Sequence, residues 1–142
     1  MVKQAAGTIF LSTSTGRCLL NLRSNKKSRH GLTCSLLVGM IEKGETPIQS
    51  LHRELEEEMG FVPDIEKTYP VDIYESNDKK FRYYSFVSIV NDEFIPVLNK
   101  ESLGYCWTSI GNWPRPLHIG AKITLIDNDI NDKLRKFLQN NS

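Results

Sequence analysis

The stretch from Gly39 to Phe61 reads GMIEKGETPIQSLHRELEEEMGF, and its helix start and stop signals decide the local fold. Thr46 is a good N-cap residue, a proline follows at the first helical position, and Gln49 completes a capping box with Thr46. Gly60 is placed to end the helix, because glycine readily adopts the left-handed conformation found at helix C-termini. These signals predict one helix from about residue 47 to residue 59, preceded by a polar loop.

Two different faces run along this predicted helix. At about 100° per residue, one stripe is apolar and indicates the side that packs on the rest of the protein. It consists of Ile48, Leu51, Leu55 and Met59. The adjoining face carries Glu54, Glu57 and Glu58, whose relative spacings of three and four residues let their carboxylates converge.

The acidic face predicts a site for divalent cations. Like charges on adjacent turns repel one another by a few tenths of a kcal/mol, so the cluster needs an occupant. Mg²⁺ or Mn²⁺ prefers such oxygen ligands, and the backbone carbonyl of Gly39 is a further candidate ligand. Arg53 is placed to orient a helix carboxylate, and Glu45 to brace the loop before the helix. For a charge run alone, the alternative is a solvated acidic surface.

The same stretch resembles the Nudix box, G-x5-E-x7-R-E-U-x-E-E-x-G-U, in which U is a bulky aliphatic or aromatic residue. Gly39, Glu45 and the run 53–61 fill every specified position. Many members carry Pro-Gly-Gly where this chain has Val38, Gly39 and Met40. The resemblance implies a hydrolase of phosphoric anhydride bonds that uses Mg²⁺ or Mn²⁺, and an α+β fold of the Nudix type, an α/β/α sandwich with a mixed β-sheet.

Two residues outside the box gain expected roles from the resemblance. Some Nudix hydrolases carry a glutamate shortly before the tryptophan of the last strand, and Glu101 lies six residues before Trp107. Asp92 and Glu93 are the alternatives for this carboxylate. Arg23 follows the second predicted strand, where related enzymes often place a phosphate-binding arginine.

The expected site residues therefore fall into three groups. The expected catalytic residues are Arg53, Glu54, Glu57 and Glu101, the substrate-binding residue is Arg23, and the metal ligands are Gly39, Glu54, Glu57 and Glu58.

The function that the resemblance implies is that of a Mg²⁺-dependent pyrophosphohydrolase, similar to small bacterial and tailed-phage members of the family. Its expected substrates are nucleoside diphosphate derivatives, such as dinucleoside polyphosphates, ADP-ribose or FAD-like molecules. One alternative is a nucleoside triphosphate pyrophosphatase that clears damaged dNTPs. Another is a non-catalytic nucleotide sensor, although such modules usually lose the glutamates retained here. An isomerase of prenyl diphosphates ranks lower, because no cysteine has an obvious catalytic partner.

The rest of the chain predicts strands on both sides of the acidic helix and a second helix at the end. The expected strands cover residues 7–11, 17–22, 33–38, 71–74, 81–90 and 105–110, and the last helix covers residues 128–139. Residues 113–118 contain two prolines and predict an ordered loop at the rim of the site. This order favours one layered α+β domain over residues 1–142.

Amino-acid composition limits the expected binding partners and cellular location of the protein. Hydrophobic residues make up 39% of the chain, charged residues 25%, and the formal net charge is +1, so neither stable nucleic-acid binding nor a membrane span is expected. The three cysteines lack metal-ligand spacing and predict reduced thiols in a reducing compartment. With no signal peptide recognisable in the sequence, the expected location is the cytoplasm. The expected partner is a small nucleotide substrate, and the oligomeric state stays open, with a homodimer as one alternative.

Overall fold

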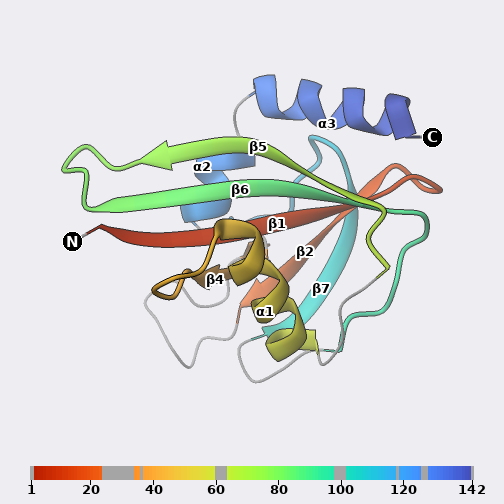
Figure 1. Cartoon of the computed structure of the whole chain (residues 1–142). Helices are drawn as coiled ribbons and strands as arrows, with labels where there is room; N and C mark the ends of the chain where they lie inside the picture. Colours follow the sequence, from red (N-terminus) through yellow and green to blue (C-terminus); the bar gives the residue numbers. More distant parts are fainter. Residues whose placement is uncertain are drawn as a thin grey trace.

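The computed structural model describes residues 2–23, 34–35, 37–59, 64–97, 102–117, 119–125 and 128–141. Within this part of the chain, seven strands form one mixed sheet with helices on both faces, which confirms the predicted fold class (Figure 1). The strands are β1 (Lys3–Ser12), β2 (Arg17–Arg23), β3 (Cys34–Ser35), β4 (Leu37–Met40), β5 (Lys67–Glu75), β6 (Phe81–Val90) and β7 (Ser102–Ser109). The helices are α1 (Pro47–Met59), α2 (Ile119–Leu125) and α3 (Asn128–Asn141).

Strand β1 lies at the centre of the sheet and has two different neighbours along one edge. Its residues 5–8 pair with β4, whereas residues 10–11 pair with β2. On its other edge β1 runs parallel to β6 along its whole length, and β5 continues the sheet beyond β6. Strands β1 and β2 therefore pair only at one end, and the β3–β4 segment leads from β2 across to β1.

The alternation of side chains along β1 creates the two halves of the core. Ile9 and Leu11 face α2 and α3, whereas Ala6 and Phe10 face α1. On the α1 side, Leu51 and Leu55 are buried against these strand residues, and burial of each leucine contributes about 1.5–3 kcal/mol. The apolar stripe of α1 thus fixes the helix on the sheet and leaves its acidic face available.

The structure corrects the predicted apolar stripe at one end. Ile48 is 38% exposed, so it lies at the edge of the interface and not within it. On α3, by contrast, Ile130 and Leu134 are buried and Phe137 and Leu138 pack against the same core, as the sequence predicts.

Three other differences from the sequence-based expectations have local causes. The expected strand 33–38 is two short strands, because the chain crosses from β2 to β1 there, and Gly39 lies inside β4. Strand β5 extends past Pro70 through a register shift, which is how a sheet accommodates proline. Helix α2 was not predicted: its IGAKITL sequence has poor helix propensity, and burial of its side chains overrides that preference.

None of the described helices combines the length and the hydropathy that a membrane-spanning helix needs.

Candidate active site around Arg53

The start of helix α1 is fixed by reciprocal hydrogen bonds. The Thr46 backbone N–H donates to Oε1 of Gln49 at 2.9 Å, and the Gln49 backbone N–H donates to Oγ1 of Thr46 at 3.2 Å. This is the capping box that the sequence predicts. Helix α1 therefore begins at Pro47 and ends at Met59, as expected, and the direction of every side chain on it follows from that start.

Arg53 joins the helix to the preceding loop through Glu45. Its Nε donates to Oε2 of Glu45 at 2.8 Å and its Nη2 donates to Oε1 at 3.0 Å, a two-point contact between guanidinium and carboxylate. Oε1 of Glu45 also accepts the backbone N–H of Glu42, and Nη2 of Arg53 also donates to the Met40 carbonyl at 3.0 Å. The loop before α1 is thus braced by Glu45, and the end of β4 is tied to the same guanidinium.

These contacts shift the pKa values of both partners. The hydrogen bond from Arg53, and then the one from the Glu42 backbone, hold the pKa of the Glu45 carboxyl below its usual value. In return, the hydrogen bond to Glu45 raises the pKa of the Arg53 guanidinium above its usual value. The pair therefore stays ionised across the range in which enzymes work.

The remaining nitrogen of Arg53 faces the acidic side of the helix. Nη1 donates to Oε1 of Glu54 at 2.8 Å and lies 3.4 Å from both carboxylate oxygens of Glu57. It also lies 3.8 Å from Oε1 of Glu42. Four carboxylates, those of residues 42, 45, 54 and 57, thus lie within 4 Å of one guanidinium, which leaves a formal excess of three negative charges.

The backbone of β4 approaches the Glu54 side chain so closely that any larger residue at position 39 would displace it. A Cβ atom at position 39 would overlap Cγ and Cδ of Glu54 and would lie 2.6 Å from its Oε1. Gly39 therefore lets the strand backbone and a helix carboxylate share one small space. The sequence predicted Gly39 as a site residue, and this contact gives the physical reason for glycine at that position.

The structure brings four of the predicted site residues together, namely Gly39, Arg53, Glu54 and Glu57. Glu58 lies on α1 and Arg23 at the end of β2, but neither side chain is within the described part of the chain. Glu101 lies outside the described residues altogether. Among the side chains that are described, no three histidines, cysteines or carboxylates converge on one point as a complete metal site.

Two groups at the site were not singled out from the sequence. Glu42 adds a fourth carboxylate near Arg53, and the Met40 carbonyl accepts both Arg53 and the Ser50 hydroxyl, the latter at 3.3 Å. Ser50 lies one turn before Arg53 on the helix, so the two side chains are neighbours. This three-residue spacing could have predicted that both contact the same group.

The alternative carboxylates Asp92 and Glu93 lie in a different environment. Glu93 accepts Nε and Nη2 of Arg17 at 2.6 and 2.7 Å, a pair that joins the start of β2 to the segment after β6. Nearby, the Trp107 indole N–H donates to the Phe94 carbonyl at 3.1 Å, and the two rings pack edge to face. Glu93 and Trp107 thus have structural partners of their own.

The fold and the acidic helix define a family. The sequence model described as NUDIX domain matches residues 1–125, so the chain belongs to the Nudix family. It is a hydrolase of the class that acts on phosphoric anhydride bonds. No curated protein matches the sequence.

Solved structures with the same fold come from several bacteria. A MutT NUDIX hydrolase from Burkholderia pseudomallei is 20% identical with a TM-score of 0.71, over 89% of this chain and 97% of that one. The NUDIX domain of Shewanella oneidensis NrtR, complexed with ADP ribose, is 14% identical with a TM-score of 0.70, over 97% and 89%. The Nudix hydrolase RenU from M. smegmatis is 18% identical with a TM-score of 0.69, over 99% and 87%. At these identities the similarity establishes the fold alone.

Proposed function

We propose that this protein is a Mg²⁺-dependent pyrophosphohydrolase that cleaves a diphosphate linkage in a nucleoside diphosphate derivative. The observation that carries the proposal is the excess of carboxylates around Arg53, held next to the backbone of Gly39. Dinucleoside polyphosphates, ADP-ribose and FAD-like molecules are the substrates to test first. The NrtR domain, which has the same fold, binds ADP ribose, and this supports a substrate of that size.

The donor atoms at this site suit a hard divalent cation. The carboxylates of Glu54, Glu57 and Glu58 and the carbonyl of Gly39 would hold Mg²⁺ or Mn²⁺, since both ions prefer oxygen ligands. The close approach of Gly39 to Glu54 favours this assignment, because the backbone that carries the Gly39 carbonyl lies beside the acidic face of the helix. When bound, the metal supplies positive charge to the phosphoryl oxygens and lowers the pKa of a bound water.

The protein's own groups position the reaction and take up the proton. Arg53 holds Glu54 and the loop carboxylate Glu45 in fixed directions, so it is a positioning residue. A glutamate of the acidic face, or Glu101, accepts the proton of the attacking water. We assign Arg23, at the end of β2, to a substrate phosphate, as the resemblance to Nudix hydrolases implies.

A nucleoside triphosphate pyrophosphatase of the dNTP-sanitising type is the second candidate, because the same acidic site suits a triphosphate and the Burkholderia structure is a MutT hydrolase. A non-catalytic sensor fits less well, since Glu54 and Glu57 are retained and ordered by Arg53. An isomerase that uses a cysteine is disfavoured at Cys18 and Cys106, because burial raises the pKa of both thiols. Both are free thiols, which supports a reducing, cytoplasmic setting.

A substrate panel tests this proposal directly. Purified protein is incubated with each candidate nucleotide and Mg²⁺ or Mn²⁺, and the products are identified by mass. We expect cleavage between two phosphorus atoms and complete loss of activity in EDTA, restored by added metal. Release of pyrophosphate from dNTPs, with no cleavage of dinucleotides, would move the assignment to the second candidate. Tight binding of a nucleotide without turnover would establish the sensor.

A further inference from the structure

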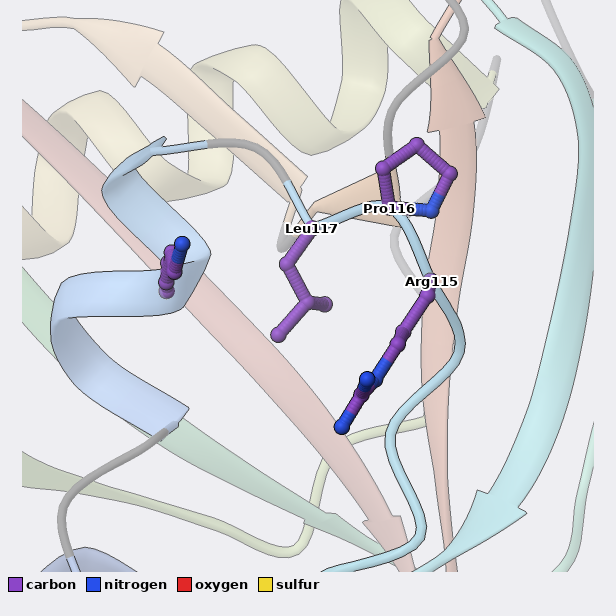
Figure 2. Close-up of a pocket in the computed structure, with 4 residues that line it drawn as sticks. Arg115, Pro116 and Leu117 are labelled. Atoms are coloured by element: carbon purple, nitrogen blue, oxygen red, sulfur yellow. The ribbon is translucent and has the colours of Figure 1, made fainter.

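A second candidate binding region lies on the opposite face of the sheet from the acidic helix. A pocket of about 420 Å³ is lined by Arg115, Pro116, Leu117 and Lys122. Figure 2 shows Arg115 and Leu117 extending their side chains from the segment that precedes α2. Lys122 lines the pocket from α2 itself. Two cationic side chains from different segments thus border one hollow with an apolar wall.

Both walls of the pocket are anchored to the core. Before Arg115, the Trp113 indole N–H donates to Oδ1 of Asn131 on α3 at 3.2 Å, and Asn131 is buried. On α2, the Thr124 hydroxyl lies 3.0 Å from the Ser85 hydroxyl of β6, and both are buried. The two cations are therefore carried by backbone that is held in place and do not depend on each other for position.

Arg115 differs from the other described arginines in its ion pairing. Each of the other arginines whose side chains are described forms an ion pair with a carboxylate; these are Arg17, Arg53, Arg82 and Arg135. Within the described part of the chain, Arg115 has no such partner, and neither has Lys122. Two like charges bordering one pocket repel each other, so an anion bound between them stabilises the arrangement.

We propose that Arg115 and Lys122 form an anion subsite that binds a phosphate group. The planar guanidinium suits two oxygens of a phosphate, and the ammonium adds a point charge. The apolar side of Leu117 gives the uncharged part of the same ligand a surface to contact.

The bound phosphate could come from two sources, and the position of the pocket relative to the acidic site bears on both. Helix α2 contacts β3, and helix α1 contacts β4, the next strand in the chain. The pocket and the acidic site thus lie on opposite faces of the sheet, beside the short strands β3 and β4. The phosphate is therefore either a part of the substrate remote from the cleaved linkage, which rests on the proposed function, or free phosphate acting as an inhibitor.

Binding of inorganic pyrophosphate in EDTA tests the subsite without turnover. Metal removal leaves the acidic helix repelling phosphate, and the pocket variants show how much of the remaining binding, measured by calorimetry, belongs to the pocket. We expect Arg115→Gln and Lys122→Gln each to weaken binding at least about tenfold, since each removes a charged hydrogen-bond donor. Arg115→Lys should retain binding within about tenfold, because it keeps the charge. Lys136→Gln on α3 makes the same charge change at an exposed position outside the pocket, and it should bind as the wild type does.

Two results would overturn the subsite. One is absence of pyrophosphate binding by the wild type in EDTA. The other is equal binding by the two pocket variants and Lys136→Gln, provided that thermal melts show all three folded. These results are independent of hydrolysis, so the proposed function can stand while the subsite fails.

Steady-state kinetics then distinguishes the two sources. If the substrate supplies the phosphate, Arg115→Gln raises KM more than it lowers kcat, and it does so only for substrates with the additional phosphate. If free phosphate is the ligand, the variant loses inhibition by phosphate more than it changes KM. Either pattern supports the subsite and names its occupant.

Discussion

Two arginines in this protein form the same kind of carboxylate pair in very different surroundings. Arg17 binds Glu93 at 2.6 and 2.7 Å, and Arg53 binds Glu45 at 2.8 and 3.0 Å. The Arg17 side chain is 46% exposed with that single carboxylate as its ion-pair partner among the described residues, whereas Arg53 is 23% exposed and has three further carboxylates within 4 Å.

The comparison distinguishes the structural ion pair at Arg17 from the candidate site at Arg53. At Arg17 the charges cancel, and an exposed pair of this kind contributes little to stability. At Arg53 the geometry of the pair is similar, but the surplus carboxylates are the oxygen ligands that the proposed divalent cation prefers. We interpret the excess of negative charge around Arg53, more than the ion pair itself, as the mark of the proposed functional region, and the following experiments test this interpretation.

The largest expected effect is at the surplus carboxylates. Glu57→Gln should lower kcat by at least about a hundredfold, because it removes negative charge from the proposed metal site. Glu58→Gln should do the same. The fold should survive, since the change is isosteric and the Glu57 side chain is 59% exposed. Kinetics with Mg²⁺ measures the effect, and Glu93→Gln is the matched control because its carboxylate belongs to the structural pair. A folded Glu57→Gln variant with full activity would refute the metal-site assignment.

The second prediction concerns the carboxylate outside the box. If Glu101 acts on the transition state, Glu101→Gln should lower kcat far more than it changes KM. Lys100→Ala, at the neighbouring position, should have little effect by comparison. Initial rates over a range of substrate concentrations separate the two parameters. Near wild-type activity of Glu101→Gln, together with a severe defect in Asp92→Asn, would transfer the role to the segment after β6.

The third prediction tests the contact between strand and helix. Gly39→Ala should destabilise the protein by about 1–3 kcal/mol, because the new methyl group overlaps Glu54 and forces that side chain away. Activity should fall as well, since Glu54 leaves its position beside Arg53. Chemical denaturation measures the free energy of unfolding. Gly104→Ala on β7 is the control, because a Cβ there has no neighbour within 4 Å. Equal stability of the two variants would show that the close approach is not required.

The smallest expected effect is on acid stability. Their arginine partners lower the pKa of both Glu45 and Glu93 in the folded protein, from an ordinary value of 4.5. A carboxyl whose pKa is lower in the folded than in the unfolded protein stabilises the fold. This contribution is fully present above the unfolded-state pKa and is lost as the pH falls through the folded-state pKa. Glu45→Gln and Glu93→Gln should therefore reduce the loss of thermal stability below about pH 4.5, as thermal melts at several pH values would show. An unchanged pH dependence in both variants would show that these pairs do not contribute.

Local signals explain how far the sequence alone could predict this structure. Thr46 and Gln49 define the start of α1 because capping involves only neighbouring residues, and the spacing of Leu51 and Leu55 identifies its buried side. Helix α2 escaped prediction because its formation depends on burial against the sheet, a non-local effect.

The sequence by itself determined the family and the acidic helix, and it predicted Gly39, Arg53, Glu54 and Glu57 as site residues, because residue type and spacing along one loop and helix carry that information. Only the tertiary structure decided which groups meet. It placed Gly39 against Glu54, gathered four carboxylates around one guanidinium, and left Arg115 and Lys122 together at a pocket on the opposite face. Such contacts depend on how strands β1 and β2 diverge and on how β3 and β4 lead from β2 back to β1, and this geometry arises from the packing of the whole sheet.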